Sequence, residues 1–199
     1  MWTRELSYTA ESEMFGALRY EVFSMQLGWV LGDRVRKIEL DQLDPTAHHI
    51  GVFDRANTLV GYSRIIQGGQ PGGLLCEQPA FAALLPLGIA FTSDTAEVSR
   101  MCVRPEYQRK SRRGGLVITI ALFRAIHEYC LSRGVHLLYA VADDKDERNY
   151  NHKAFLMRLL PFTAISGPVY LDAKGGSWLL QLDVPAAAQL PAVKKLLNL

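Results

Sequence analysis

Cysteine is scarce in this chain of 199 residues, and Cys76, Cys102 and Cys130 show no paired spacing. An odd, widely separated set of cysteines predicts neither a disulfide framework nor a zinc site. The five histidines also lack the spacing of metal ligands. We therefore expect a reduced, cytosolic protein with no metal.

Long apolar runs, internal repeats and low-complexity linkers are missing as well. No stretch approaches the roughly 18 consecutive apolar residues that span a membrane. The opening residues, Met1 to Glu5, lack the basic-then-apolar layout of a secretory signal. The length and the 49% hydrophobic and 21% charged content are ordinary for a globular protein. We expect one domain over residues 1–199 with no membrane span.

Net charge is small, at +2, but it is unevenly placed. Five of the 22 basic residues fall between Arg104 and Arg113, where only Glu106 opposes them. No aromatic interleaving or recognition-helix pattern accompanies them, which argues against nucleic-acid binding. A solvated loop is the plain alternative. Because a strong helix pattern follows, the loop and helix N-terminus could also hold a phosphate through Arg109, Lys110, Arg112, Arg113 and Gly114.

Hydrophobic periodicity predicts an alternating series of elements. We expect helices at 10–27, 81–85, 115–133, 149–160 and 190–197, and strands at 49–53, 59–66, 95–103, 135–142, 169–172 and 178–183. Residues 32–44 are expected to be mostly irregular. In the first helix, Phe15, Leu18, Val22 and Met25 share a spacing typical of one apolar face. The order predicts a mixed α/β sheet with helices on both faces.

The strand at 95–103 carries the most informative polar residues. Alternation would place Glu97, Ser99 and Met101 on one face, and Val98, Arg100 and Cys102 on the other. A glutamate where an apolar residue would cost less must be paired or used. It could form an ion pair with Arg64 or Arg100, or it could accept a proton from an attacking amine, directly or through water. Both interpretations stay open at this point.

The segment after this strand resembles the coenzyme A loop of the GNAT acyltransferase superfamily, which reads Gln/Arg-x-x-Gly-x-Gly/Ala. Counting from Gln108, Ser111 and Arg113 replace the expected small residues. The departure favours a carrier with a single phosphate, the 4′-phosphopantetheine of acyl carrier protein. The basic run would also suit an acidic carrier surface.

A closer resemblance covers the first half of the chain in order. Arg19-x-x-x-Phe23, Trp29, the segment Glu39 to Asp44, Arg64 and Glu97-x-Ser99-Arg100 resemble acyl-homoserine-lactone synthases, which acylate S-adenosylmethionine. From Glu97 through Tyr107-Gln108-Arg109 to residues 162–169, the chain is more similar to long-chain N-acyl amino acid synthases, including N-acyltyrosine synthases. It resembles that group best. Met101 and Leu43 depart from the lactone-synthase pattern, which has aromatic residues at both positions.

The resemblance implies one GNAT-like domain that moves a long fatty acyl group from acyl carrier protein to the amino group of an amino acid such as tyrosine. Glu97 would accept the amine proton, and backbone N–H groups near Met101 and Val103 would polarise the carbonyl. The implied substrate-binding residues are Arg19, Phe23, Trp29, Asp41, Asp44, Arg64, Phe81, Ser99 and Arg100. The carrier arm would lie along Cys102 and Arg104 beside the basic run, with no other cofactor.

Several alternatives remain open for these residues and for the function. Asp41 and Asp44 could anchor a loop, and Arg64 and Arg100 could either join a buried network or clamp a substrate carboxylate. For function, the alternatives are lactone synthesis from S-adenosylmethionine and a non-catalytic module that binds an acyl ligand.

Overall fold

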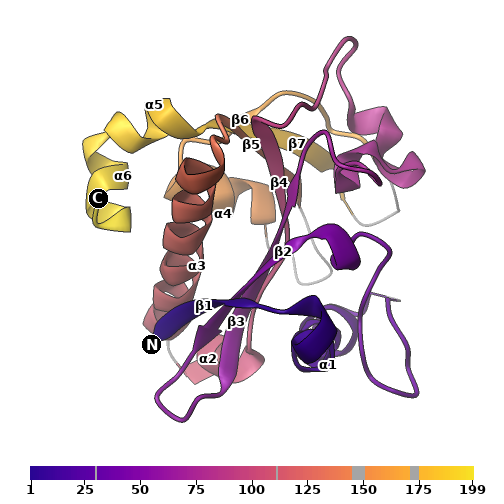
Figure 1. Cartoon of the computed structure of the whole chain (residues 1–199), viewed down its shortest axis with the longest axis vertical. Coiled ribbons are helices and arrows are strands. Elements are labelled where there is room, and N and C mark those ends of the chain that lie inside the picture. Colours follow the sequence, from indigo (N-terminus) through magenta and orange to yellow (C-terminus); the bar gives the residue numbers. More distant parts are fainter. Residues whose placement is uncertain (30, 111, 145–150, 171–174) are drawn as a thin grey trace. The chain divides into compact units, whose positions relative to one another are not determined.

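The computed structural model describes residues 1–29, 31–110, 112–144, 151–170 and 175–199, apart from the side chains at 109, 110, 112 and 113. Its seven strands form a mixed sheet in the order β1-β2-β3-β4-β5-β7-β6. The chain divides into two compact units. The first unit comprises Met1–Ile65 and Arg100–Glu128, and the second comprises Ile66–Ser99 and Tyr129–Leu199. Strands β3 and β4 and helix α3, labelled in Figure 1, each contribute residues to both units by their bounds.

The first unit is built on an antiparallel arrangement of β1 (Trp2–Leu6), β2 (His48–Phe53) and β3 (Leu59–Gln67). The register runs from Trp2↔Phe53 to Leu6↔His49, and from His48↔Ile65 to Phe53↔Leu59. The Asp54 carboxylate accepts the N–H groups of Ala56 and Thr58 in the turn that joins β2 to β3. The predicted strand pair is therefore confirmed. Strand β1 was not predicted, because Leu6 is its one buried residue and no apolar alternation marks it.

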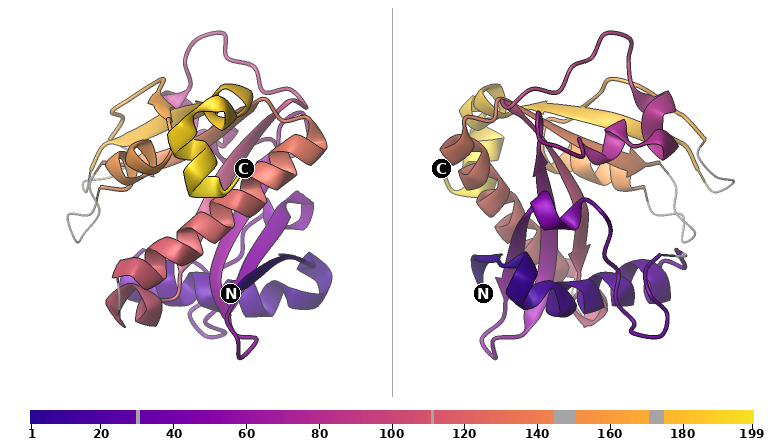
Figure 2. Two further views of the ribbon diagram at one scale, coloured as in Figure 1. Left: turned by 90° about the vertical axis from the view of Figure 1, so that its left-hand side faces the viewer. Right: turned by 45° about the vertical axis from the view of Figure 1, so that its right-hand side comes forward.

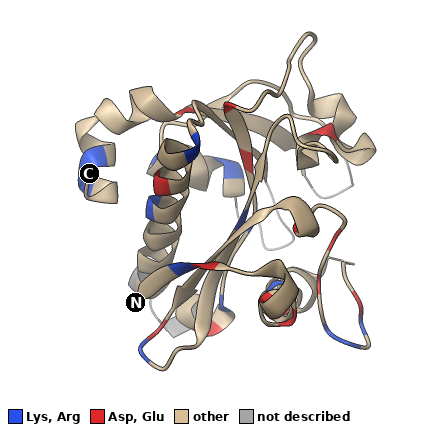
Figure 3. Cartoon of the chain, viewed as in Figure 1, with Lys and Arg blue, Asp and Glu red and all other residues tan. Residues whose placement is uncertain are grey.

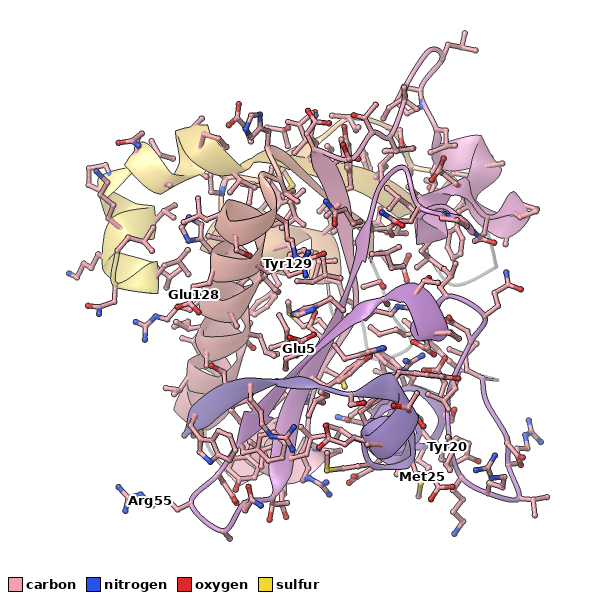
Figure 4. All side chains as sticks on the ribbon, in the orientation of Figure 1. Glu5, Tyr20, Met25, Arg55, Glu128 and Tyr129 are labelled. Atoms are coloured by element: carbon pink, nitrogen blue, oxygen red, sulfur yellow. The ribbon has the colours of Figure 1, made fainter. Side chains whose placement is uncertain are left out.

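The N-terminal helix continues as two geometries, α1 (Tyr8–Arg19) and the π-helix η1 (Tyr20–Gln26). Phe15, Leu18 and Val22 are buried as predicted, but Met25, labelled in Figure 4, is 67% exposed. The prediction for Met25 was wrong because a π-helix takes more residues per turn than the α-helical spacing assumes. The buried face packs with Leu6, Phe53, Leu59 and Tyr62 in one apolar cluster.

Helix α3 (Arg112–Arg133) packs on β3 in the first unit. A Cβ added to Gly61 would lie 2.3 Å from Ile118 Cγ2, so only glycine lets this backbone approach so closely. Ile118, Leu122, Phe123 and Ile126 are buried. The 20-residue stretch Gly114–Arg133 is the one described helix long and apolar enough to cross a membrane, a test that core helices also pass.

The second unit contains the start of β4 (Thr95–Val103), β5 (Leu137–Asp143), β7 (Ser177–Asp183) and β6 (Thr163–Ala164). Strands β4 and β5 are parallel, whereas β7 is antiparallel to β5 and to β6. The other elements are η3 (Leu75–Glu77), η4 (Pro79–Leu84), α4 (His152–Leu159), α5 (Val184–Gln189) and α6 (Pro191–Leu197). The contacts between α5 and α6 hold these C-terminal helices together (Figure 2).

Two predicted segments differ from the structure. The basic segment, expected to be a loop, contains helix α2 (Pro105–Lys110) and the start of α3, with residue 111 outside the described residues. The hairpin expected at 169–172 is reduced, in the described residues, to an isolated bridge between Val169 and Ser177, and β6 is the short strand that pairs with β7. Local sequence patterns could not reveal that β6 pairs with β7, because this pairing depends on contacts with the rest of the second unit.

Candidate functional site

Strand β4 is interrupted at Arg100, whose φ of 52° lies in the left-handed region. A non-glycine residue with such a φ is uncommon and costs about 1–3 kcal/mol, so the surrounding structure must hold it there. The regular alternation expected along β4 therefore does not hold at this residue. The change of direction directs the Arg100 side chain toward two carboxylates, those of Glu39 and Asp41.

A buried charge cluster forms in the first unit from three arginines and three carboxylates. Arg19 Nε donates to Glu39, and its Nη1 lies 2.7 Å from Asp44 Oδ1. Arg64 Nη1 lies 2.7 Å from that same Asp44 oxygen and 2.5 Å from Asp41 Oδ1. In Figure 3, α1 carries both basic and acidic residues; its basic residue is Arg19. The charge cluster consists of Arg19, Glu39, Asp41, Asp44, Arg64 and Arg100.

Arg100 completes the charge cluster, with Nε 3.2 Å from Glu39 and Nη2 3.0 Å from Asp41. Formal charges then balance at three positive and three negative. The side chains of Arg19, Arg64 and Asp44 are 0% exposed, whereas Arg100 is 13% and Asp41 24% exposed. Burial opposes ionisation of Asp41, but the hydrogen bond from Arg64 and the charges of Arg64 and Arg100 lower its pKa. Within the charge cluster, Asp41 and Arg100 are therefore the two side chains exposed enough to reach a ligand.

One aromatic residue predicted for the substrate site, Phe23, lies beside Arg100 and stacks on a second, Trp29. Phe23 and Trp29 stack with ring centroids 5.2 Å apart and an interplanar angle of 11°. The Arg100 guanidinium carbon lies 5.9 Å from the Phe23 ring centroid, within reach of a cation–π interaction. Trp29 N also donates to Phe23 O, which closes the turn between them. The structure thus gathers Arg19, Phe23, Trp29, Asp41, Asp44, Arg64 and Arg100, seven of the predicted substrate-binding residues, in the first unit.

Glu39, a member of the charge cluster, was not among the predicted site residues, and neither were His49 and Tyr62, which support the cluster from outside it. His49 Nε2 lies 2.9 Å from the Asp44 carbonyl oxygen, and Nδ1 lies 2.7 Å from Tyr62 Oη. Because a carbonyl oxygen only accepts, Nε2 carries the proton. Burial disfavours the charged imidazole, so His49 is neutral and Nδ1 accepts from Tyr62. Burial lowers the pKa of His49, and burial raises the pKa of Tyr62. His49 pairs with Arg64 across β2 and β3, and this pairing would have pointed to His49 as a neighbour of the charge cluster. It could be used only once the register of the two strands was known.

Glu97 lies in the second unit and is 0% exposed. Its Oε2 accepts the N–H of Cys76 at 2.9 Å. Its neighbour across the parallel β4–β5 ladder is Tyr139, and within this unit the described ladder ends at that pair although β5 continues to Asp143. Tyr139 Oη accepts from Gln181 at 3.3 Å. Ser99 is 9% exposed, and Phe81 lies in η4.

The residues assigned to the carrier are engaged with their own unit. Arg104 N donates to Val60 O at 2.8 Å, and Val103 O accepts from Gln108 at 2.7 Å. The Arg104 guanidinium lies 3.2 Å from Glu21. The expectation that the carrier arm lies along the backbone near Cys102 to Arg104 stays a prediction, and the Arg104 N–H and the Val103 carbonyl oxygen already have partners within the unit. The side chains of Arg109, Lys110, Arg112 and Arg113 lie outside the described residues.

Cys102 is buried next to the charge cluster, and Met101 is only half-buried. Burial raises the pKa of Cys102 to about 12, so its thiolate is scarce at neutral pH and nucleophilic catalysis by this residue is disfavoured. Across the residues with described positions, no group of three or more His, Cys, Asp or Glu side chains could hold a metal ion.

Residues 18–117 match the family model described as an acetyltransferase (GNAT) domain. No curated protein sequence matches the chain. Among solved structures, TofI in a ternary complex with an inhibitor and MTA is 20% identical, with a TM-score of 0.77, covering 100% of this chain and 97% of TofI.

Two other solved structures are similar in fold. BjaI, a CoA-dependent acyl-homoserine lactone synthase with SAM and isopentyl-CoA, is 18% identical, with a TM-score of 0.74, covering 99% of this chain and 88% of BjaI. FeeM, an N-acyl amino acid synthase from uncultured soil microbes, is 21% identical, with a TM-score of 0.66, covering 92% of this chain and 89% of FeeM. At these identities the similarities show the fold, and the predicted fold class is confirmed.

Proposed function

We propose a donor and an acceptor for this chain, which belongs to the acetyltransferase (GNAT) domain family. It is an acyltransferase by family. The proposed reaction moves a long fatty acyl group from acyl carrier protein to the α-amino group of an amino acid such as tyrosine, over the single domain of residues 1–199. The similarity to an N-acyl amino acid synthase supports this acceptor class.

The observation that carries the proposal is the placement of Glu97. Its buried carboxylate lies at Glu97↔Tyr139, the last described pair along the β4–β5 ladder in the second unit. A thioester arm can bind along a strand through main-chain hydrogen bonds, and we place it beside this end of the ladder. An amine approaching that thioester would then lie within reach of Glu97, directly or through one water molecule.

The reaction needs a free amine, because an α-amino group has a pKa of about 8 and is mostly protonated at neutral pH. Glu97 accepts that proton, and the amine nitrogen attacks the thioester carbonyl carbon. Backbone N–H groups at Met101 and Val103 stabilise the negative charge that develops on oxygen. The C–S bond then breaks, the thiolate of the carrier leaves and takes up a proton, and the new C–N bond remains. Holding both substrates in place supplies much of the rate.

The acceptor is assigned to the partly exposed edge of the charge cluster. Arg19 and Arg64 are already paired with buried carboxylates, so they fix the loop that carries Asp41 and Asp44. Arg100 is partly exposed and lies beside Phe23, on which Trp29 stacks. An amino acid would place its carboxylate near Arg100 and its aromatic side chain near these rings. Phe81 and Ser99 are assigned to the acyl group.

The donor assignment rests on the basic segment. Ser111 and Arg113 stand where the coenzyme A loop of the family has small residues. A single phosphate needs fewer main-chain contacts from this segment than a pyrophosphate does. The segment is also basic, through Arg109, Lys110, Arg112 and Arg113, which favours an acidic carrier protein. Gly114, Cys102 and Arg104 complete the proposed carrier side. Acyl carrier protein and coenzyme A with the same acyl chain would be compared directly, and a preference for the coenzyme A donor would overturn this assignment.

The test of the acceptor is incubation of the purified chain with acylated carrier protein, all amino acids and S-adenosylmethionine, read by mass spectrometry. We expect an N-acyl amino acid. Glu97→Gln should lower the rate by at least about 100-fold at neutral pH, since a general base contributes about 10²–10⁴-fold. Glu128→Gln, an exposed carboxylate labelled in Figure 4, is the matched control and should keep full activity. Near-full activity of Glu97→Gln would remove the base assignment.

Lactone synthesis is the second candidate, favoured by the similarity to BjaI, whose structure contains SAM. The two reactions differ in acceptor, so the same incubation separates them: an acyl-homoserine lactone would replace the proposed product. A non-catalytic acyl-binding module would release no thiol in an acceptor-dependent manner.

A further inference from the structure

A pocket in the second unit lies where β5, β6 and β7 meet the start of α5. Its volume is about 340 Å³, within the range of roughly 300–1,000 Å³ that small-molecule sites occupy. Thr163, Gln181 and Asp183 are its polar lining residues, and Leu137, Ala187 and Leu190 are among the apolar ones. None of the described residues that line it belongs to the predicted site residues, so the pocket is separate from the proposed reaction.

The strand register places the polar lining residues on one face of the sheet. Gln181 of β7 pairs with Thr163 of β6, and Asp183 pairs with Leu137 of β5. Directly paired residues project to the same face, and so do residues two apart along one strand. Gln181 and Asp183 therefore lie next to each other on the face that carries Thr163 and Leu137.

The hydrogen bonds already made by these residues leave mainly acceptors. Thr163 Oγ1 donates to the Gln181 carbonyl oxygen at 3.3 Å, and Gln181 Nε2 donates to Tyr139 Oη at 3.3 Å. Asp183 is the N-cap of α5, and its Oδ1 accepts from Ala186 N at 2.8 Å. A carboxylate has about four lone-pair positions, so Asp183 can accept further hydrogen bonds, as can the Gln181 amide oxygen.

The charge of the pocket is negative. Among the described lining residues Asp183 is the one charged side chain, and none of them is basic. An anion would meet this carboxylate with no lining cation to offset it, whereas an ammonium would gain a charge-assisted hydrogen bond. Leu137, Ala187 and Leu190 add apolar surface, which favours an apolar body attached to that ammonium.

We propose that this pocket binds a small primary amine whose apolar body carries no carboxylate. The ammonium donates to the Asp183 carboxylate and to the Gln181 amide oxygen, and the apolar body packs on Leu137, Ala187 and Leu190. A free amino acid is disfavoured, because its own carboxylate would lie close to Asp183. The site takes no part in the proposed acyl transfer.

Two probes of matched shape and opposite charge test the preference: 3-methylbutylammonium and 4-methylpentanoate. Each is titrated into the full chain, labelled with carbon-13 at the leucine and alanine methyl groups, and NMR follows the methyl signals. We expect the ammonium to bind with a Kd of about 1 mM or tighter and to shift the signals of Leu137, Ala187 and Leu190. The carboxylate should leave them unmoved. Equal shifts with both probes, or no shift with the ammonium, would overturn the proposal.

Two variants locate the binding site. Asp183→Asn removes the charge but keeps the cap of α5, since asparagine and aspartate are equally good N-caps. It should weaken binding of 3-methylbutylammonium by about tenfold or more, as expected for the loss of a charge-assisted hydrogen bond. Ala186→Leu, at an exposed residue that lines the pocket, should block binding by filling it.

Glu128→Gln is the control, because Glu128 is an exposed carboxylate on α3 and does not line the pocket. Its Kd for 3-methylbutylammonium should equal that of the wild type. An unchanged Kd in both Asp183→Asn and Ala186→Leu would overturn the proposal. The titration needs no turnover, so a wild-type chain that acylates no amino acid would overturn the proposed function alone.

Discussion

Asp44 is the centre of the charge cluster, and replacing it with asparagine tests the electrostatic reasoning most directly. One oxygen of Asp44 lies 2.7 Å from both Arg19 and Arg64, and the other accepts the Asp41 N–H at 2.6 Å. Asp44→Asn keeps the size of the side chain but removes its charge. The buried guanidinium groups of Arg19 and Arg64, both 0% exposed, would then lose the carboxylate that neutralises them.

The expected loss of stability is about 3–5 kcal/mol, the usual cost of leaving a buried charge without its partner. With a urea m-value of about 2 kcal/mol/M, the unfolding midpoint should fall by about 1.5–2.5 M. The assay is urea unfolding monitored by circular dichroism, with the wild type, Asp44→Asn and a control variant at equal protein concentration and ionic strength.

Glu13→Gln is the matched control, because it removes the charge from an ion pair with Arg36 whose side chains are 77% and 58% exposed. Exposed pairs contribute about 0–1 kcal/mol, so its midpoint should barely change. If Asp44→Asn lost no more stability than Glu13→Gln, the charge cluster would not be the buried, charge-balanced network inferred from its distances and burial.

Two further predictions concern stability in the first unit. His49 is neutral and its pKa is lowered by burial, so the unfolded chain takes up a proton below about pH 6.5 while the folded chain does not. The free energy of unfolding should therefore fall from pH 7.5 to pH 5.5, and His49→Gln should show a smaller fall; an identical fall would contradict the assignment. Gly61→Ala should cost about 1–3 kcal/mol, because its Cβ would lie 2.3 Å from Ile118 Cγ2. Gly115 lies in α3, and a Cβ added there would have Gln108 Cα as its nearest neighbour, at 3.7 Å. Gly115→Ala should therefore raise the free energy of unfolding by about 0.5–1 kcal/mol, measured by thermal or urea unfolding, and the reverse order of the two variants would refute the packing argument.

Much of the secondary structure was predictable because it depends on local patterns. The strand at 95–103 matches β4, and the long helix ending at Arg133 matches α3 apart from its start. These elements alternate or repeat at the strand and helix periods, and turn residues bound them. The prediction that Met25 belongs to the apolar face was wrong, because the spacing of apolar residues does not reveal the π-helical geometry of η1.

The site was predictable in part. The motif carried Arg19, Asp41, Asp44, Arg64 and Arg100, and the structure joins these five through ion pairs. The motif left open whether these arginines pair with the carboxylates of the chain or with a substrate carboxylate. That outcome depends on distances and burial, since the same residue types could serve either role.

Local patterns and motifs in the sequence were enough to predict the family, the order of most helices and strands, and the kinds of residue available for acyl transfer. Which side chains pair with one another depended on the tertiary structure. Cys76 meets Glu97 across 21 positions, and Tyr62 hydrogen-bonds His49 across two paired strands. Arg100 turns toward Glu39 and Asp41 because its backbone leaves the strand conformation. Hydrogen bonds and ion pairs act over a few ångströms in space, and only the packed chain brings distant residues within that range.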